Sequence, residues 1–336
     1  MRVALFSSQR YDRDSFSFVN DAFGHDLVFL EPRLSQESVA LARGFPGVCV
    51  FVNDQVDAPV LRALHDDGTR LVLLRSAGFN QIDIEEAARL GIAVARVPEY
   101  SPHAVTEHTI GLILSLDRKI HRAFNRGREG NFSLDGLLGF DLHGKTVGIV
   151  GTGRIGKVVV RILRGFGCRL LLHDPFPDRA LEGDDARYVA MEDLLEESDV
   201  VTLHCPLTPQ TRHLIDVVAL RRMKPGVMLI NTSRGPLLDT RAVIEALKTR
   251  HIGSLGLDVY EEEGDLFFRD LSDQVITDDV FTRLLTFPNV LVTSHQAFFT
   301  REALHNIATT TLGNAAAFER NEPSGNEVLP AAVRRG

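Results

Sequence analysis

The sequence predicts an α/β protein of two domains, each built around a parallel sheet. Short runs rich in Val, Ile or Leu that end at Ser, Gly, Asn or Asp alternate with segments of helical period, as in parallel sheets flanked by helices. The chain has 336 residues, which exceeds the roughly 250–300 residues that one hydrophobic core usually supports. A Gly-rich turn after one apolar run is the third indication, because such turns open helices in doubly wound folds.

The first part of the chain carries five expected strands, which we place in one sheet. They are Val3–Ser7, Leu27–Leu30, Val48–Val52, Leu71–Arg75 and Ala93–Val97. Between them, Ala58–His65 and Ile84–Leu90 have apolar residues at positions i, i+3 and i+4, the pattern of amphipathic helices. Asp57 and Asp83 are the expected N-caps, because a carboxylate at that position accepts the free N–H groups of the first helical turn.

A domain boundary is expected near residue 100, where Pro98 and Pro102 interrupt the pattern. One long helix, His103–Phe124, is expected to lead into a second, doubly wound sheet of six strands. These strands are Thr146–Val150, Arg169–His173, Val200–His204, Val227–Asn231, Ser254–Asp258 and Val290–Ser294. The last helix, Thr300 to about Phe318, is expected to pack back on the first domain. Residues 1–100 and 300–336 then form a discontinuous domain into which residues 101–299 are inserted.

Composition and charge exclude several classes of function. The 37 basic and 45 acidic residues give a net charge of −8, which favours neither nucleic acid nor an anionic membrane surface. Cys49, Cys168 and Cys205 lie in apolar runs without a C-x-x-C pair, so we expect buried thiols and no metal site. No apolar run is long enough to span a bilayer, and the N-terminus enters a strand rather than a signal peptide. We therefore expect a cytoplasmic protein.

A G-x-G-x-x-G motif, Gly151, Gly153 and Gly156, lies between the strand Thr146–Val150 and a helix expected over Arg154–Phe166. In this context the first glycine permits a tight turn, the second lets the backbone approach a pyrophosphate, and the third lets the helix pack closely on the strand. The helix N-terminus then offers N–H groups and a positive dipole end to the phosphates. The motif predicts a dinucleotide site.

Asp174 ends the next strand, where a carboxylate can accept hydrogen bonds from both ribose hydroxyls of an adenosine and would repel a 2′-phosphate. The expected cofactor is therefore NAD, with NADP a minor alternative because Arg179 follows shortly. Together these features predict two Rossmann or flavodoxin-like domains with parallel sheets. The NAD-binding domain is the one inserted into the discontinuous, substrate-binding domain.

Two ionisable residues at strand ends point to an oxidoreductase acting on a small acid. Arg234 follows the strand Val227–Asn231, and its guanidinium can bind a carboxylate bidentately, as an α-keto or α-hydroxy acid requires. His295 follows the strand Val290–Ser294, and an imidazole there can give a proton to a carbonyl oxygen as hydride arrives. Ligands of open α/β sheets bind at these carboxyl ends of strands.

A carboxylate hydrogen-bonded to His295 would favour the imidazolium ion and orient the ring. Glu261, Glu262 and Glu263 follow the strand that carries Asp258, and the residues alone do not decide which of the three serves. Asp258 itself is expected to line the nicotinamide pocket.

The chain resembles the D-isomer-specific 2-hydroxyacid dehydrogenases along essentially its whole length, and within them the D-lactate dehydrogenases of fermentative bacteria. The motifs that carry the resemblance are Val52–Asp54, Ser76–Asn80, Arg96–Pro102, Lys119–Arg122, Asn131–Gly136, His204–Pro209, Leu257–Phe268 and His295–Thr300. The resemblance implies that Arg234 binds and polarises the substrate, that Glu263 is the partner of His295, and that His295 is the acid/base. It thus selects one of the three glutamates.

The resemblance also implies the remaining contacts. Besides the three glycines, the expected NAD contacts are Arg154, Ile155, Asp174, Cys205, Pro206, Thr211, Thr232, Ser233, Arg234 and Asp258. The expected substrate contacts, besides Arg234 and His295, are the backbone N–H groups of Ala77 and Gly78 and the side chains of Tyr100 and Phe298. The implied substrates are pyruvate and D-lactate, and the implied assembly is a homodimer or homotetramer, for which the helix His103–Phe124 is a candidate surface.

Two other functions stay open at this point. The first is the same chemistry on a bulkier 2-keto acid, such as phenylpyruvate or a branched-chain acid. The second is an NAD(H)-sensing regulatory protein, since some proteins that resemble this family act as corepressors. The long link from Glu263 to His295 and the Gln-Ala-Phe-Phe sequence after His295 favour the lactate branch over relatives that act on larger or phosphorylated acids.

Overall fold

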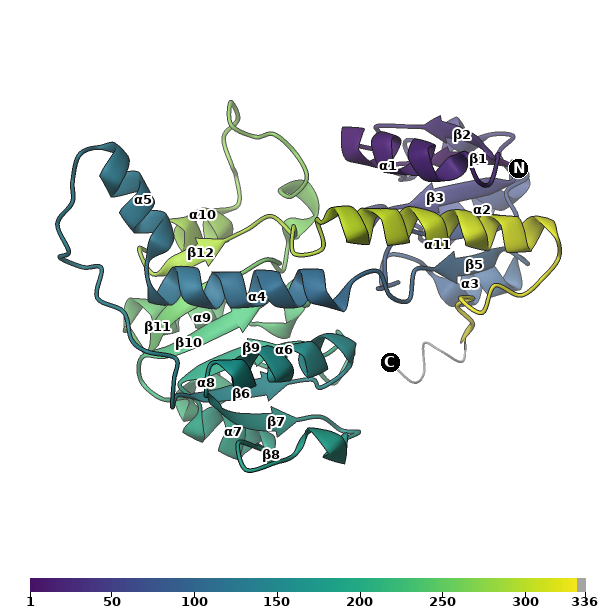
Figure 1. The fold of residues 1–336 in the computed structure, drawn as a ribbon. Coiled ribbons are helices and arrows are strands. Elements are labelled where there is room, and N and C mark those ends of the chain that lie inside the picture. The colour runs from purple at the N-terminus through teal and green to yellow at the C-terminus, as the bar shows by residue number, and fades with distance from the viewer. Residues whose placement is uncertain (331–336) are drawn as a thin grey trace. The chain divides into compact units, whose positions relative to one another are not determined.

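The structure is a computed structural model that describes residues 1–330, and the chain separates into two compact units (Figure 1). The first unit comprises Met1–Ser101 together with the chain from Phe299 onward, and the second is Pro102–Phe298. Each unit contains one sheet in which all strands run parallel. The predicted fold class is therefore confirmed.

The sheet of the first unit has the order β2-β1-β3-β4-β5. Its strands are β1 (Arg2–Leu5), β2 (Asp26–Phe29), β3 (Gly47–Val50), β4 (Leu71–Leu74) and β5 (Ala93–Arg96). The five predicted strands are all present, although each ends one or two residues earlier than the apolar pattern indicated. All residues of β3 and β4 are buried, as expected for central strands of a parallel sheet covered on both faces.

Four α-helices belong to the described part of the first unit: α1 (Arg10–Asn20), α2 (Ala58–Asp66), α3 (Ile84–Arg89) and α11 (Arg301–Glu319). The predicted N-caps of α2 and α3 are confirmed, because the Asp57 carboxylate accepts from the N–H of Val60 and the Asp83 carboxylate from that of Glu86. The predicted C-terminal helix is also confirmed. It packs against α1, β4 and β5 (Figure 1), and Asn314 on α11 donates to the Arg96 carbonyl at the end of β5, at 3.0 Å.

The second unit has a sheet of seven strands in the order β12-β11-β10-β9-β6-β7-β8. The strands are β6 (Thr146–Val150), β7 (Arg169–His173), β8 (Ala186–Tyr188), β9 (Val200–Leu203), β10 (Val227–Asn231), β11 (Ile252–Leu257) and β12 (Val290–Val292). Six strands were predicted, and β8 was missed. It has three residues, of which Ala186 alone is buried, so it lacks the apolar run on which the prediction relied.

Seven α-helices lie within the described part of the second unit. They are α4 (Pro102–Asp117), α5 (Ile120–Arg128), α6 (Arg154–Gly165), α7 (Met191–Glu197), α8 (Val217–Arg222), α9 (Thr240–Lys248) and α10 (Asp279–Leu285). Among them, α5 contacts α4 rather than the sheet. The chain crosses from one side of β6 to the other between β8 and β9, so the order of strands reverses between β6 and β9. Open α/β sheets bind their ligands at such a switch point, outside the carboxyl ends of the strands.

The prediction of one long helix over His103–Phe124 was wrong. The helix breaks into α4 and α5 at Lys119, whose backbone is left-handed with φ of 50°. The chain that returns over residues 138–140 occupies the end of α4: the Asp117 carboxylate accepts from the N–H of Phe140 at 2.7 Å, and Lys119 donates to the Leu138 carbonyl at 2.5 Å. The break is therefore caused by a contact distant in the sequence, and no Gly or Pro marks it.

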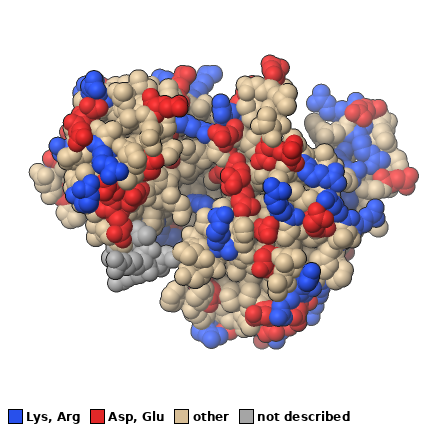
Figure 2. Space-filling model, turned by 180° about the vertical axis from the view of Figure 1, so that it is seen from behind, with Lys and Arg blue, Asp and Glu red and all other residues tan. Residues whose placement is uncertain are grey.

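The distribution of charged side chains and cysteines is the one expected from the composition. On the face shown in Figure 2, acidic and basic side chains are interspersed rather than gathered by sign. The three cysteines are free and buried, as predicted. Within residues 1–330, no helix combines the length and the apolar character that crossing a bilayer requires, and no cluster of His, Cys, Asp or Glu in that range could hold a metal ion.

Candidate active site

The glycine motif forms the turn from β6 to α6 at the switch point of the second sheet. Gly151 has a φ of +93°, and a Cβ placed there would lie 2.6 Å from the backbone nitrogen of Cys205 at the end of β9. Only glycine fits both the conformation and the close approach. A Cβ on Gly156 would collide with the Gly151 carbonyl, whereas the nearest strand atom, on Ile149, would lie at an ordinary 3.8 Å, so the turn itself requires this glycine.

Gly153 differs from the other two glycines, because a Cβ at this position would meet nothing within 4 Å. The residue is exposed and is the N-cap of α6, so open space lies directly before the N–H groups of the first helical turn. This arrangement fits a pyrophosphate that approaches the backbone from outside, at the positive end of the helix dipole.

Asp174 follows β7 and lies beside the glycine turn. One oxygen of its carboxylate accepts the Thr152 N–H at 2.7 Å and the Thr152 hydroxyl at 3.2 Å, and the other accepts the N–H of Phe176 at 2.9 Å. A carboxylate has about four acceptor positions, so the half-exposed Asp174 keeps capacity for ribose hydroxyls. Arg179, the residue that left NADP open, is paired with Glu182 at 2.8 Å.

The loops after β9 and β10 follow the two strands that continue the sheet from β6, on the side away from β7. The Ser233 hydroxyl donates to the Cys205 carbonyl at 2.7 Å, the Thr211 hydroxyl donates to the Pro206 carbonyl at 2.7 Å, and Thr232 shares a hydrogen bond of 2.8 Å with Thr109. These loops contain six of the predicted cofactor residues, namely Cys205, Pro206, Thr211, Thr232, Ser233 and Arg234, whereas Arg154 and Ile155 begin α6 and Asp258 follows β11. Burial lowers the pKa of neighbouring His204 to about 4, so that imidazole is neutral at pH 7.

Arg234 follows β10 in a loop that the sequence fixes locally. Asn231 accepts from the N–H of Ser233 at 3.0 Å and donates to the Arg234 carbonyl at 2.8 Å. The Arg234 guanidinium donates to the Ser233 carbonyl at 2.7 Å and has no carboxylate partner within residues 1–330. A half-buried cation with unused donors is suited to bind an anion.

His295 and Glu263 form a hydrogen-bonded pair, with 2.8 Å between Nδ1 of the ring and Oε1 of the carboxylate. Both side chains are largely enclosed, 15% and 18% exposed respectively. The second oxygen of Glu263 accepts from the N–H of Tyr260 at 3.1 Å. Because Nδ1 faces a carboxylate, it carries hydrogen, and Nε2 is the ring nitrogen that can exchange a proton with a substrate.

The structure distinguishes the three glutamates that the residues alone left open. Glu261 bonds to His213 at 2.5 Å and to the Thr240 hydroxyl at 2.9 Å, near the start of α9. Glu262 is exposed. Glu263 is thus the member of the run that bonds to His295, in agreement with the role that the resemblance implied.

Asp258 lies at the end of β11 and is completely buried. Its oxygens accept from the Thr293 hydroxyl at 2.5 Å and from the N–H groups of Gln296 and Ala297, both at 2.9 Å, and its main-chain carbonyl accepts from the N–H of His295 at 2.7 Å. Burial raises the pKa of this carboxyl, but hydrogen bonds from His108 and Thr293 and the nearby imidazoles outweigh that effect and lower it. The contact of Asp258 with the nicotinamide stays a prediction. Its hydrogen bonds to the turn that carries His295 are present in the structure.

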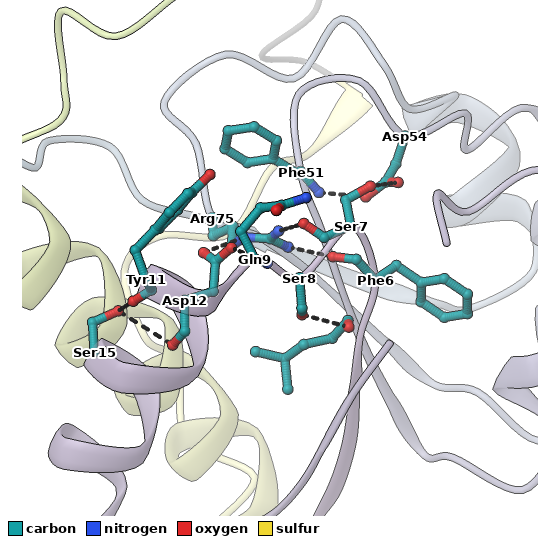
Figure 3. A network of polar contacts seen from close by, with 11 residues as sticks. Phe6, Ser7, Ser8, Gln9, Tyr11, Asp12, Ser15, Phe51, Asp54 and Arg75 are labelled. Atoms are coloured by element: carbon teal, nitrogen blue, oxygen red, sulfur yellow. Dashed lines mark hydrogen bonds and ion pairs between the residues drawn. The ribbon is translucent and has the colours of Figure 1, made fainter. Parts of the chain in front are cut away.

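In the first unit, Arg75 organises the chain around the predicted Ala77–Gly78 turn. Its buried guanidinium donates to the carbonyls of Phe6 and Ser7, both at 2.8 Å, and pairs with Asp12 at 3.3 Å (Figure 3). These bonds join the ends of β1 and β4. The network was not foreseen, because a strand that ends in arginine gives no sign of where the side chain points.

In the Ala77–Gly78 turn both carbonyls are hydrogen-bonded, which leaves the N–H groups available to a ligand. The Ala77 carbonyl accepts from Arg96 at 2.8 Å, and the Gly78 carbonyl accepts from the Ser76 hydroxyl at 2.8 Å. Neither N–H has an acceptor within residues 1–330. Of the other predicted pocket residues, Tyr100 is joined through its carbonyl to Asn306 at 2.7 Å, and Phe298 in the second unit is buried.

Comparisons with known proteins agree with this geometry. Residues 110–297 match the family model of the D-isomer specific 2-hydroxyacid dehydrogenase NAD-binding domain. The D-lactate dehydrogenase of Escherichia coli is 50% identical over 98% of this chain and 100% of its own, and its apo-structure superposes with a TM-score of 0.89. A 2-hydroxyacid dehydrogenase homolog of Schizosaccharomyces pombe is 53% identical over 96% of this chain and 98% of its own.

A D-lactate dehydrogenase from Lactobacillus jensenii, solved with NAD⁺, is 31% identical over 98% of this chain and 99% of its own, with a TM-score of 0.81. The fold, the glycine turn and these similarities define an NAD-dependent oxidoreductase. More particularly, the chain belongs to the D-isomer-specific 2-hydroxyacid dehydrogenases, near the D-lactate dehydrogenases of that family. The predicted family and cofactor are confirmed.

Replacing Asp174 by Asn should weaken NADH binding about tenfold or more, because hydrogen bonds to a charged acceptor contribute about 1.5–3 kcal/mol. NADPH should lose less affinity or gain some, since the repulsion of its 2′-phosphate disappears. Fluorescence titration of the binary complexes measures both dissociation constants without requiring turnover. Asp185→Asn, which alters a carboxylate paired with Arg164 at 3.0 Å, is the matched control. Equal losses for NADH and NADPH in Asp174→Asn would exclude the ribose contact.

Proposed function

We propose that the protein is a D-lactate dehydrogenase that reversibly reduces pyruvate to D-lactate with NADH. The observation that carries this proposal is the His295–Glu263 pair, at 2.8 Å, in the same unit as the glycine turn and Arg234. Similarity to enzymes named D-lactate dehydrogenase supports the choice of substrate and the hand of the product. The free, buried state of all three cysteines agrees with a reducing compartment such as the cytoplasm.

The residues of the second unit supply binding and proton transfer. NADH, when bound, supplies the hydride that reduces the keto carbon. Arg234 binds the substrate carboxylate and polarises the carbonyl, since its guanidinium has donors to spare. His295 gives the proton on Nε2 to the keto oxygen, so the negative charge that develops on oxygen and the positive charge of the imidazolium vanish together. Glu263 keeps the ring oriented and favours its protonated form before the reaction.

The first unit is proposed to contribute to recognition of the same carboxylate. The N–H groups of Ala77 and Gly78 have no acceptor within residues 1–330, and Arg75 and Arg96 hold the chain around them. Tyr100 and Phe298 are proposed to limit the size of the substrate side chain. These roles follow from the family resemblance, and the orientation of the turn supports them.

One observation keeps a bulkier substrate as a second candidate. The chain is similar to a D-2-hydroxyisocaproate dehydrogenase, 30% identical with a TM-score of 0.84 over 98% of this chain and 99% of that one. That similarity is weaker than the one to the D-lactate dehydrogenase of Escherichia coli, so pyruvate is the preferred substrate.

We also propose that the protein is a homo-oligomer, through a surface that begins in the last part of the predicted helix, His103–Phe124, and continues into the segment after it. Helix α4 packs against α6, β10 and β11, and nine of its 16 residues are buried. The following segment exposes five large apolar side chains: Ile120, Phe124, Phe132, Leu134 and Leu138. Apolar side chains gathered in one exposed segment are typical of an interface between protein chains.

A panel of 2-keto acids of increasing size tests the substrate. With pyruvate, 2-oxobutyrate, 4-methyl-2-oxopentanoate and phenylpyruvate, kcat/KM for NADH oxidation should be highest for pyruvate and about tenfold or more lower for the largest acid. In the reverse direction D-lactate should be oxidised and L-lactate should not. A preference for phenylpyruvate would establish the second candidate, and no oxidation of NADH with any acid would exclude both.

Glu263→Gln should lower kcat/KM for pyruvate about tenfold or more, with a deficit that grows as pH rises, because the neutral amide no longer favours imidazolium. The pH profile of NADH oxidation measures this. Glu262→Gln, the same change at the exposed neighbour, should retain the profile of the unaltered enzyme. His295→Gln should lose about 10²–10⁴-fold of kcat while still binding NADH. Parallel profiles for Glu263→Gln and Glu262→Gln would contradict the pair.

Sedimentation velocity tests the assembly. The unaltered protein should have the mass of two or four 37.2 kDa chains, and Phe132→Glu combined with Leu138→Glu should shift it toward the monomer, because charges are costly inside an apolar interface. Val275→Glu, at a side chain that is 88% exposed elsewhere in the second unit, is the control. A monomeric mass for the unaltered protein would exclude the oligomer.

A further inference from the structure

A polar chain of contacts that does not include Glu263 reaches the turn of His295, and it begins on α4. Nε2 of His108 lies 3.0 Å from the Thr293 hydroxyl and 3.3 Å from Oδ1 of Asp258. The Thr293 hydroxyl lies 2.5 Å from the same Asp258 oxygen. Because a carboxylate can only accept, the Thr293 hydroxyl donates to Asp258 and is left to accept from His108. The direction of the hydrogen bonds is thereby fixed.

The far end of this chain of contacts is the turn that carries the proposed acid/base. His295 has a φ of +54°, in the left-handed region, which is sparsely populated by residues other than glycine and is strained for them. Such a conformation persists only where the surroundings hold it. Here the carboxylate and carbonyl of Asp258 hold three consecutive N–H groups, those of His295, Gln296 and Ala297.

We propose that His108 is a positioning residue for the reaction: through Thr293 it orients the buried Asp258 carboxylate, and through Asp258 it fixes the turn that aims His295. This inference rests on the proposed function for its consequence in catalysis. His108 and Thr293 had no role in the sequence analysis, and both act on His295 through Asp258 rather than by touching substrate.

The identity of residue 108 is better explained by this role than by packing. His108 lies on the same face of α4 as Val105 and Leu112, both buried, where the helical pattern would accept another aliphatic residue. The side chain is 20% exposed, against 1% for the Asp258 side chain it contacts. The adjacent Thr109 bonds to Thr232, at the start of the Arg234 loop. One turn of α4 thus supports both the His295 turn and the loop after β10.

The test separates the hydrogen bond from the bulk of each side chain. His108→Leu and Thr293→Val remove the contacts, whereas His108→Gln keeps an N–H donor and Thr293→Ser keeps the hydroxyl. His103→Leu makes the same change as His108→Leu at an exposed position of the same helix and is the control. For each variant, kcat and KM with pyruvate and the dissociation constant of NADH are measured.

In His108→Leu and Thr293→Val, kcat should fall about tenfold, as is usual for residues that orient a catalytic group, with KM and NADH binding nearly unchanged. His108→Gln and Thr293→Ser should recover most of the loss. The double variant His108→Leu/Thr293→Val should be at most about twofold worse than the worse single one, since both break one chain of contacts. The proposal would be overturned if the losses of kcat in the two single variants multiplied in the double variant. It would also be overturned if NADH binding fell as much as kcat and the Gln and Ser variants recovered neither.

A second readout does not depend on the substrate. The proton between Nδ1 of His295 and Glu263 should give a downfield NMR signal in the NADH complex, assigned by its loss in His295→Gln. The signal should shift in His108→Leu and Thr293→Val and stay in place in His103→Leu. If the signal shifts but no 2-keto acid is reduced, the proposed function fails and the positioning role stands. If pyruvate is reduced but neither the signal nor kcat responds, the positioning role fails.

Discussion

All strands of the second sheet run parallel, so their carboxyl ends meet at one edge, and this constraint places every candidate group of that unit. Gly151 follows β6, Asp174 follows β7, Arg234 follows β10 and His295 follows β12. A parallel sheet buries its strands on both faces, which leaves the loops at this edge as the place where polar chemistry can gather. The site therefore depends on the sheet for position and on loop hydrogen bonds for orientation.

Orientation is achieved mainly by pairing loop N–H groups with buried oxygens. Asn231 closes the Arg234 loop, Glu263 accepts from Tyr260 as well as from His295, and Asp258 gathers the turn after β12. Burying a carboxylate costs free energy unless its oxygens accept hydrogen bonds. The oxygens of Asp258 accept them from the Thr293 hydroxyl and from two N–H groups of the following turn. Asp258 is consequently a rigid support, and a shift at any one of its partners is transmitted to the others.

The sequence predicted what is local and missed what depends on tertiary contacts. Apolar runs located the central strands, and the glycine motif with Asp174 predicted the NAD cofactor that the family comparison supports, because each signal lies within one strand–turn–helix unit. The three residues of β8 carry no apolar run, and the break at Lys119 is caused by residues 138–140. The sequence alone could not distinguish Glu263 from Glu261, because the distinction depends on the contacts of Glu261 with His213 and Thr240. His108 could have been suspected only as a polar residue within the apolar face of α4.

The two carboxylates nearest His295, those of Asp258 and Glu263, differ in how their charges are compensated. Asp258 has its acceptor positions filled by N–H and hydroxyl donors, whereas Glu263 depends on His295 for the partner of one oxygen. In the proposed reaction, transfer of the Nε2 proton from His295 would change the pair from neutral to negative, and a proton from solvent would restore it. The exposed fractions of 15% and 18% leave solvent access to this pair while the Asp258 side chain, 1% exposed, has almost none. One carboxylate is therefore suited to take part in proton exchange and the other to remain a fixed support.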